Sequence, residues 1–260
     1  AVSFDNHVGH DYLEDYEERF ESYHRKESRI QFDLELFNKI TKGGLPNKTL
    51  NIALAGTGVG KSLFMCHHAS SVLLDGKNVL YITLEMAEEK IAERIDANLL
   101  NVNIQNITEL PKPMFESKVN NLAKKTQGTL IIKEYPTASA HSGHFKSLLN
   151  ELALKKSFTP DIIFIDYLNI CASSRYRTNN NVNSYSYIKA IAEELRGLAV
   201  EANVPIVSAT QTTRSGFASS DVDLTDTSES FGLPATADLM FALISTEELE
   251  GLGQIMVKQL

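Results

Sequence analysis

The sequence predicts an α/β fold with a mostly parallel central sheet and helices on both faces. Short apolar runs alternate with longer, helix-like segments from about residue 28 onward. A glycine-rich segment joins one apolar run, residues 50–55, to a helix-like segment at 63–74. Parallel neighbours in a sheet need long crossover connections, which are usually helices, so this alternation is typical of a parallel α/β sheet.

Each predicted strand is a short, apolar run, as expected for strands that are buried on both faces. The predicted strands are 50–55, 79–84, 130–133, 162–165, 205–209, 239–244 and 254–257. The predicted helices lie between strands and are longer, with polar and apolar residues mixed at helical spacing. They are 63–74, 88–100, 112–125, 143–155 and 186–202.

The composition limits the class of protein. The chain has 260 residues, which suits one large domain, and its net charge is −8. This charge argues against a protein that covers nucleic acid with a broad basic surface, although a narrow, locally basic channel stays possible. The sequence has no signal peptide and no apolar run long enough to span a bilayer. Cys66 and Cys171 are expected to be free, buried thiols.

Residues 1–27 differ from the rest and are interpreted as a linker segment that precedes an α/β domain at 28–260. Residues 11–21 are expected to form an amphipathic helix with an acidic face. Its aromatic stripe consists of Tyr12, Tyr16, Phe20 and Tyr23. This helix could pack on its own domain or dock on a neighbouring subunit. Because the chain starts at Ala1 and ends at Leu260 inside a predicted strand, we expect a fragment of a longer protein, truncated at its C-terminal end.

A phosphate-binding P-loop is the most specific motif. The pattern G-x-x-x-x-G-K-[ST] is met except at its first position, which is Ala55. Lys61 is expected to reach the β- and γ-phosphates of a nucleotide, and Ser62 to ligate Mg²⁺. A chance glycine-rich turn is the alternative, and the order strand, loop, Gly-Lys-Ser and helix argues against it. The predicted nucleotide-binding residues are Ala55, Gly56, Thr57, Gly58, Val59, Gly60, Lys61, Ser62 and Leu63.

Three further side chains follow predicted strands, where ligands bind in open α/β sheets. Asp166 ends a hydrophobic strand and is a candidate to hold Mg²⁺. Glu85 is a candidate to polarise the water that attacks the γ-phosphate, or else an exposed acid at the start of a helix. Gln211 is a candidate sensor of the γ-phosphate, and a long Ser- and Gly-rich stretch follows it.

Basic residues near tyrosines suggest contact with a single-stranded nucleic acid backbone. Arg175 and Arg177 lie in a stretch, 171–186, that has no acidic residue. Arg214 begins the next long stretch, whose later part is acidic and would repel phosphate. An ordinary solvated loop is the alternative interpretation.

Several motifs together resemble the ATPase domain of DnaB-type replicative helicases, over roughly residues 28–260, and the resemblance points to a bacteriophage member. The motif at 55–62 has alanine at its first position in this family too. The other matching motifs are Gly43-Gly44-Leu45, Leu84-Glu85-Met86, Ile165-Asp166-Tyr167-Leu168, Asn203-Val204-Pro205, Gln211, Ala237-Asp238-Leu239-Met240 and Lys258-Gln259.

The resemblance implies a RecA-like P-loop NTPase fold and a homo-hexameric ring in which ATP and Mg²⁺ bind between subunits and single-stranded DNA threads the channel. It implies that Lys61, Ser62 and Asp166 bind phosphate and metal, that Glu85 activates water, and that Gln211 couples the γ-phosphate to the DNA loops. It also implies a primase and a helicase loader as partners, and action in the host cytoplasm. The family's finger arginine follows Lys-Gln, but here Leu260 follows Gln259, so no finger is assigned.

Three function hypotheses remain open at this point. The first is an ATP-driven motor that moves along single-stranded DNA and unwinds duplex DNA. The second is a RecA-type recombinase that forms filaments. The third is a nucleotide-dependent loader or switch that binds ATP without moving along DNA.

Overall fold

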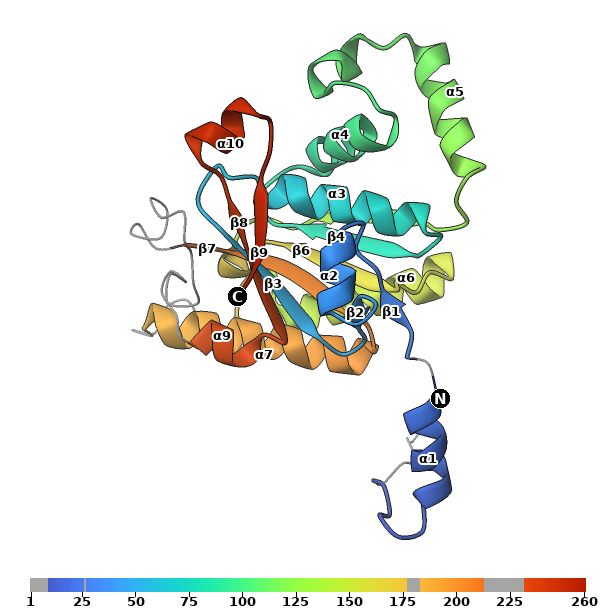
Figure 1. Cartoon of the computed structure of the whole chain (residues 1–260), viewed down its shortest axis with the longest axis vertical. Coiled ribbons are helices and arrows are strands. Elements are labelled where there is room, and N and C mark those ends of the chain that lie inside the picture. Colours follow the sequence, from blue (N-terminus) through green and yellow to red (C-terminus); the bar gives the residue numbers. More distant parts are fainter. Residues whose placement is uncertain (1–8, 26, 177–182, 213–231) are drawn as a thin grey trace.

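The structure is a computed structural model that describes residues 9–25, 27–176, 183–212 and 232–260. In this part of the chain, the centre is a seven-stranded sheet with the order β5-β4-β6-β7-β3-β8-β9 (Figure 1). All neighbouring pairs are parallel except β8 and β9, so the predicted, mostly parallel sheet is confirmed. The strands are β3 (Leu50–Ala55), β4 (Val79–Thr83), β5 (Leu130–Glu134), β6 (Ile162–Asp166), β7 (Ile206–Gln211), β8 (Leu239–Ile244) and β9 (Met256–Gln259).

Helices cover both faces of this sheet, as Figure 1 shows. One hydrophobic cluster joins the sheet to α2 (Glu35–Ile40), α3 (Lys61–Leu74) and α4 (Glu88–Leu99). A second cluster joins it to α6 (Ser142–Lys156), α7 (Ser184–Ala202) and α9 (Gly232–Thr236). Along β4, Val79 and Tyr81 belong to the first cluster, whereas Leu80 and Ile82 belong to the second. This alternation follows from the two-residue period of a strand.

The predicted strands and helices from residue 50 onward are all present, with small shifts at their ends. For example, β7 ends at Gln211, two residues beyond the predicted end at Ala209. Helix α7 starts at Ser184, because the Asn183 side chain accepts a hydrogen bond from the Tyr185 N–H and caps the helix.

Several elements were not predicted. Strands β1 (Arg29–Ile30) and β2 (Leu45–Pro46) form a small antiparallel pair before β3. Gly44 has a φ of +117°, and a Cβ there would lie 2.2 Å from the Ile30 carbonyl oxygen, so this close approach requires glycine. The other additions are α2, the 3₁₀ helices η1 (Ile104–Glu109) and η2 (Leu168–Ile170), α9 and α10 (Glu247–Gly251).

Helix α5 (Lys112–Ala123) and η1 form an outlying arm above α4 (Figure 1). None of the residues of α5 is buried. Among the described residues, none of the helices combines the length and the apolar character needed to cross a bilayer.

The predicted helix at 11–21 is shifted in the structure, where α1 spans Tyr16–His24. A turn at residues 12–15 precedes it, and the Asp11 Oδ1 atom caps this turn by accepting hydrogen bonds from the backbone N–H groups of Leu13 and Glu14. The α-helix itself begins after Asp15, its N-cap residue. Helix α1 has no buried residue and lies beyond the edge of the domain in Figure 1. The structure therefore does not show the packing of this helix on its own domain that was one of the two interpretations.

Candidate nucleotide-binding site

The P-loop leaves the carboxyl end of β3 and leads directly into α3. Gly58 and Gly60 have φ values of +81° and +113°, in the left-handed region that favours glycine. Gly60 occupies the N-cap position of α3, so the first N–H groups of this helix face the loop. Ala55 is the last residue of β3 and its φ is not positive, which is why this position does not require glycine.

Lys61 lies buried at the start of α3. Its Nζ atom donates a hydrogen bond to the Gly56 carbonyl oxygen at 3.4 Å. Burial lowers the pKa of the Lys61 amine, and the carboxylates of Glu85 and Asp166 act in the opposite direction. Both predicted acids therefore lie close enough to this amine to influence its charge.

Asp166 ends β6 and has no exposed surface. Its Oδ2 atom accepts a hydrogen bond from the Tyr81 hydroxyl at 3.0 Å, whereas its buried Oδ1 atom has no hydrogen-bond partner among the residues that the structure describes. Burial raises the pKa of this carboxyl, and the hydroxyls of Ser62 and Tyr81 and the charges of Arg94 and Lys61 oppose that rise. Carboxylate and hydroxyl oxygens suit Mg²⁺, so Asp166 and Ser62 fit this ion.

A pocket of about 220 Å³ lies between the P-loop and the ends of β4 and β7. It brings Glu85 and Gln211 to the same space as Lys61 and Ser62, although the four residues are far apart in the sequence. Leu63 is exposed and lines a separate, mostly apolar cavity between α3 and α4. The residues that line the first pocket are Thr57, Gly58, Gly60, Lys61, Ser62, Glu85, Met86, Arg94 and Gln211.

Glu85 is exposed and precedes α4, whose N-cap residue is Ala87. The alternative for Glu85 is a helix-start acid, but the Glu88 N–H donates its hydrogen bond to Glu134 at 3.2 Å. Glu134 thus satisfies this first N–H group of α4, and the Glu85 carboxylate stays at the pocket.

Gln211 is connected to the P-loop region through Tyr167. The Gln211 Nε2 atom donates a hydrogen bond to the Tyr167 hydroxyl at 3.2 Å. The ring centre of Tyr167 lies 5.6 Å from the Lys61 Nζ atom. Tyr167 therefore stands between the amide and the lysine.

Sequence reasoning missed Tyr81, Arg94 and Tyr167 as parts of this site. Tyr167 directly follows Asp166, so its position in the chain was a usable signal. Tyr81 looks like one more core residue of a buried strand, and Arg94 like one more polar residue of a surface helix. Their contacts depend on how β4 and α4 sit against α3 and β6.

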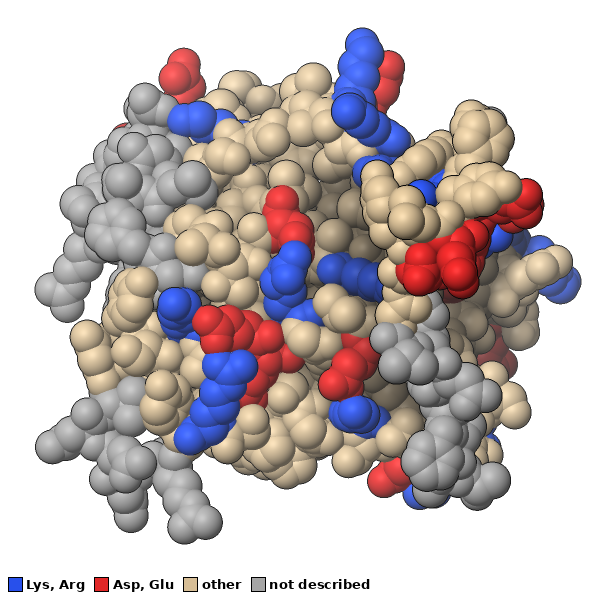
Figure 2. Space-filling model, turned by 90° about the horizontal axis from the view of Figure 1, so that it is seen from below, with Lys and Arg blue, Asp and Glu red and all other residues tan. Residues whose placement is uncertain are grey.

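Arg175, the predicted DNA-binding residue that the structure describes, does not line this pocket. Arg175 is half exposed and forms an ion pair with Glu193 of α7. The stretch around it has no acid of its own, so the acidic partner comes from another element. On the face drawn in Figure 2, the described Lys and Arg side chains are interspersed with Asp and Glu. Arg177 and Arg214 lie outside the described residues.

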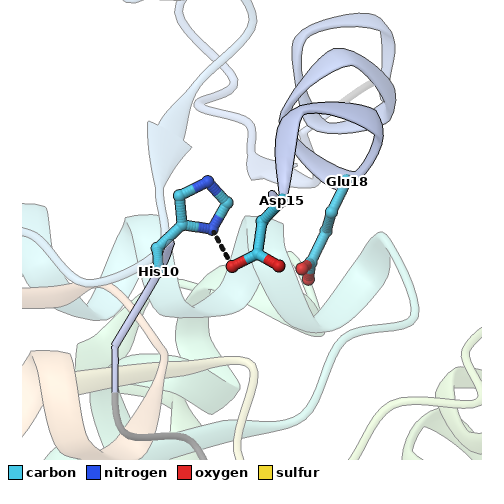
Figure 3. Close-up of side chains that lie close together, drawn as sticks. All are labelled: His10, Asp15 and Glu18. Carbon is cyan, nitrogen blue, oxygen red and sulfur yellow. Dashed lines mark ion pairs between the residues drawn. The ribbon is translucent and has the colours of Figure 1, made fainter. Parts of the chain in front are cut away.

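A group of potential metal ligands lies at the start of α1. Within the described residues, ligand atoms of His10, Asp15 and Glu18 lie within 4.8 Å of one another (Figure 3). Two of these three residues already form local hydrogen bonds. The His10 Nε2 atom is hydrogen-bonded to Arg19 at 2.9 Å, and the Asp15 carboxylate accepts a hydrogen bond from the Asp11 N–H at 2.7 Å. The group therefore stabilises the turn before α1.

Comparison with known proteins places this chain in a family. Residues 30–253 match the protein family described as "DnaB-like helicase C terminal domain". The chain is 49% identical to a DnaB-like replicative helicase of Enterobacteria phage T4, over 100% of this chain and 55% of that protein. It is 26% identical to the replicative DNA helicase DnaB of Helicobacter pylori, over 77% of this chain and 40% of that protein. The chain thus spans about half the length of these relatives.

Two solved structures share the fold. One is the structure of a DnaB-like replicative helicase and its interactions with primase. It matches with a TM-score of 0.73 and 18% sequence identity, over 93% of this chain and 59% of that one. The other is an ATPase domain, also with a TM-score of 0.73 and 18% identity, and with coverage of 94% of this chain and 86% of that one. The fold is therefore the RecA-like α/β fold of these ATPase domains. The family match and the phage relative together show that this chain belongs to the DnaB-like helicase C-terminal domain family.

Proposed function

We propose that this chain is the ATP-hydrolysing motor domain of a replicative DNA helicase. The observation that carries the proposal is the pocket that joins Lys61 and Ser62 of the P-loop to Glu85 and Gln211, with Asp166 behind it. Membership of the DnaB-like family supports the same reaction. The proposal includes a division into a linker segment, residues 1–27, and a motor domain, residues 28–260.

In this proposal, the loop N–H groups and the Lys61 amine bind the phosphates of ATP. Ser62 and Asp166 hold Mg²⁺, which supplies charge neutralisation on the phosphate oxygens. The buried Oδ1 atom of Asp166, which finds no hydrogen-bond partner in the described part of the chain, supports this assignment, because an isolated buried carboxylate oxygen is costly unless it gains a partner.

Glu85 takes a proton from the attacking water as a general base. Its exposure at the pocket supports this role, since water can reach it there. Gln211 contacts the γ-phosphate and passes the state of the nucleotide to the segment that follows it. The Gln211 contact with Tyr167, beside Lys61, supports that connection.

We also propose a homo-hexameric ring around single-stranded DNA. Exposed aromatic residues along and before α1, such as Tyr16 and Phe20, offer an assembly surface that the domain itself leaves uncovered. Arg175, Arg177 and Arg214 contact the DNA backbone. A primase and a helicase loader are the expected partners, and a phage relative suggests action in the cytoplasm of an infected bacterium.

The test is a strand-separation assay on a forked duplex, with ATP hydrolysis measured with and without single-stranded DNA. Full-length protein is used, with Lys61→Ala as the inactive control. DNA-stimulated hydrolysis together with strand separation is the expected result. Filaments on DNA without strand separation would indicate a recombinase, and nucleotide binding without turnover would indicate a switch.

A further inference from the structure

We propose that Tyr81 is a positioning residue that fixes the Asp166 carboxylate and leaves one of its oxygens directed to the Mg²⁺ site. The inference rests on the proposed function, in which Asp166 supports the metal. Tyr81 lies in the middle of the buried strand β4, and a tyrosine at such a position would by itself suggest only a role in core packing.

The register of the sheet brings the two side chains together. Strands β4 and β6 are parallel neighbours, with Tyr81 opposite Phe164 and Thr83 opposite Asp166. Tyr81 and Phe164 lie in the hydrophobic cluster beneath α3, and Asp166 lies two residues after Phe164 in the same strand. Because alternate residues share a face, Tyr81 and Asp166 are diagonal neighbours on the α3 side.

A short chain of buried hydrogen bonds fixes the direction of the contact. The Cys66 thiol, on α3, donates to the Tyr81 hydroxyl oxygen at 3.7 Å. The Tyr81 hydroxyl then donates its own proton to the Asp166 Oδ2 atom at 3.0 Å. The phenol proton is therefore committed to the carboxylate, and the two oxygens of Asp166 are no longer equivalent.

The tyrosine ring is itself held in place. Tyr81 is completely buried and stacks on Phe164, with ring centres 5.8 Å apart and an angle of 14° between the planes. A hydroxyl on such a ring has little freedom, so it restrains rotation of the carboxylate that it binds. The Ser62 hydroxyl also acts on this carboxyl, but within the described residues no hydrogen bond of normal geometry reaches the buried Oδ1 atom, so this oxygen is available to a metal or its bound water.

This arrangement orients the Mg²⁺-supporting carboxylate before the ion arrives. Outer partners that orient a metal-supporting group commonly change metal affinity by tenfold or more when they are removed. The competing explanation is that Tyr81 only fills space. The two explanations differ in what loss of the hydroxyl alone should change.

The test is Tyr81→Phe in the full-length protein, which keeps the ring and removes the hydroxyl. The probe is a fluorescent, non-hydrolysable ATP analogue whose binding is titrated with Mg²⁺. We expect the Mg²⁺ concentration for half-maximal enhancement of binding to rise about tenfold. Binding measured in EDTA should not change, because the phosphate-binding loop is intact.

A matched control is Tyr135→Phe, which removes a hydroxyl from a partly buried ring that packs on the opposite face of the sheet. This variant should leave the Mg²⁺ midpoint unchanged. Thermal melting of both variants monitors the fold.

A double-mutant cycle with Asp166→Asn tests the route of the effect. If Tyr81 acts through the carboxylate, Tyr81→Phe should cause no further shift in the Asp166→Asn background. An unchanged midpoint in Tyr81→Phe, or an equal shift in both backgrounds, would overturn the positioning role. Absence of any Mg²⁺-dependent binding by the wild-type protein would instead overturn the proposed function, and this role with it.

Discussion

The carboxyl edge of the sheet and helix α1 differ in how far their side chains are buried by the rest of the chain. At the sheet edge, Lys61 and Asp166 are buried, and their hydrogen-bond partners come from the P-loop and β4 of the same chain. Near and along α1, Tyr12, Phe20 and Tyr23 are 74%, 63% and 75% exposed. Exposed aromatic residues clustered on one helix are typical of a surface that another molecule covers.

The contrast separates two properties of the protein. The buried side chains of the sheet edge have partners within the chain, so changes there should alter nucleotide chemistry and leave the fold and the assembly in place. Helix α1 has no buried residue, so changes there should alter assembly and leave the domain folded.

The largest effect is expected from Glu85→Gln. Loss of a general base should slow ATP hydrolysis by about 100-fold or more while nucleotide binding is retained. Steady-state hydrolysis and binding of a fluorescent nucleotide measure the two quantities. Glu89→Gln is the matched control, because Glu89 is exposed on α4 and does not line the pocket. A parental hydrolysis rate in Glu85→Gln would show that this acid has no catalytic role.

The next effect is expected from Lys61→Ala. A hydrogen bond from a charged amine to phosphate contributes roughly 1.5–3 kcal/mol, so nucleotide affinity should fall by about 10- to 100-fold. Isothermal titration with ATP analogue measures the change, and sedimentation should show that assembly without nucleotide is unaltered. Equal affinity in Lys61→Ala would contradict the phosphate-binding role of this loop.

A qualitative change in assembly is expected when Tyr16 and Phe20 are both replaced by Ser. Oligomers should dissociate, whereas the melting temperature of the domain should stay the same, because neither side chain is buried. Analytical ultracentrifugation and thermal melting measure the two outcomes. Leu154→Ser is a suitable control, since Leu154 is 86% exposed on α6, away from α1. Hexamers that persist in the double variant would mean that the aromatic surface does not join subunits.

The smallest effect is expected at Arg175. Arg175→Ala should weaken binding of single-stranded DNA and lower the slope of log K against log salt by about 0.7 for the lost phosphate contact. Glu193→Gln should act oppositely and strengthen binding, because it removes the acid that pairs with this arginine. Lys155→Ala, at the end of α6, is the control. A slope that stays constant in Arg175→Ala would exclude contact with the backbone.

Much of the fold was predictable because its signals are local. The apolar run of β3, the glycines at 58 and 60, and the helix that follows are encoded within about two dozen consecutive residues. The shifted start of α1 shows the limit of such signals, because the spacing of the aromatic residues runs through the turn at residues 12–15 and does not locate the residue at which the helix begins.

The sequence alone determined the order of the seven strands of the main sheet and of the longer helices between them, the P-loop, and the carboxylate and amide side chains at the ends of β4, β6 and β7. Periodicity and turn chemistry act between near neighbours, so one sequence is enough to read them. Only the tertiary structure decided that Tyr81 bonds Asp166, that Tyr167 stands between Gln211 and Lys61, and that Glu193 pairs with Arg175. These contacts depend on strand register and on the seating of α3 and α7, which join residues distant in the chain.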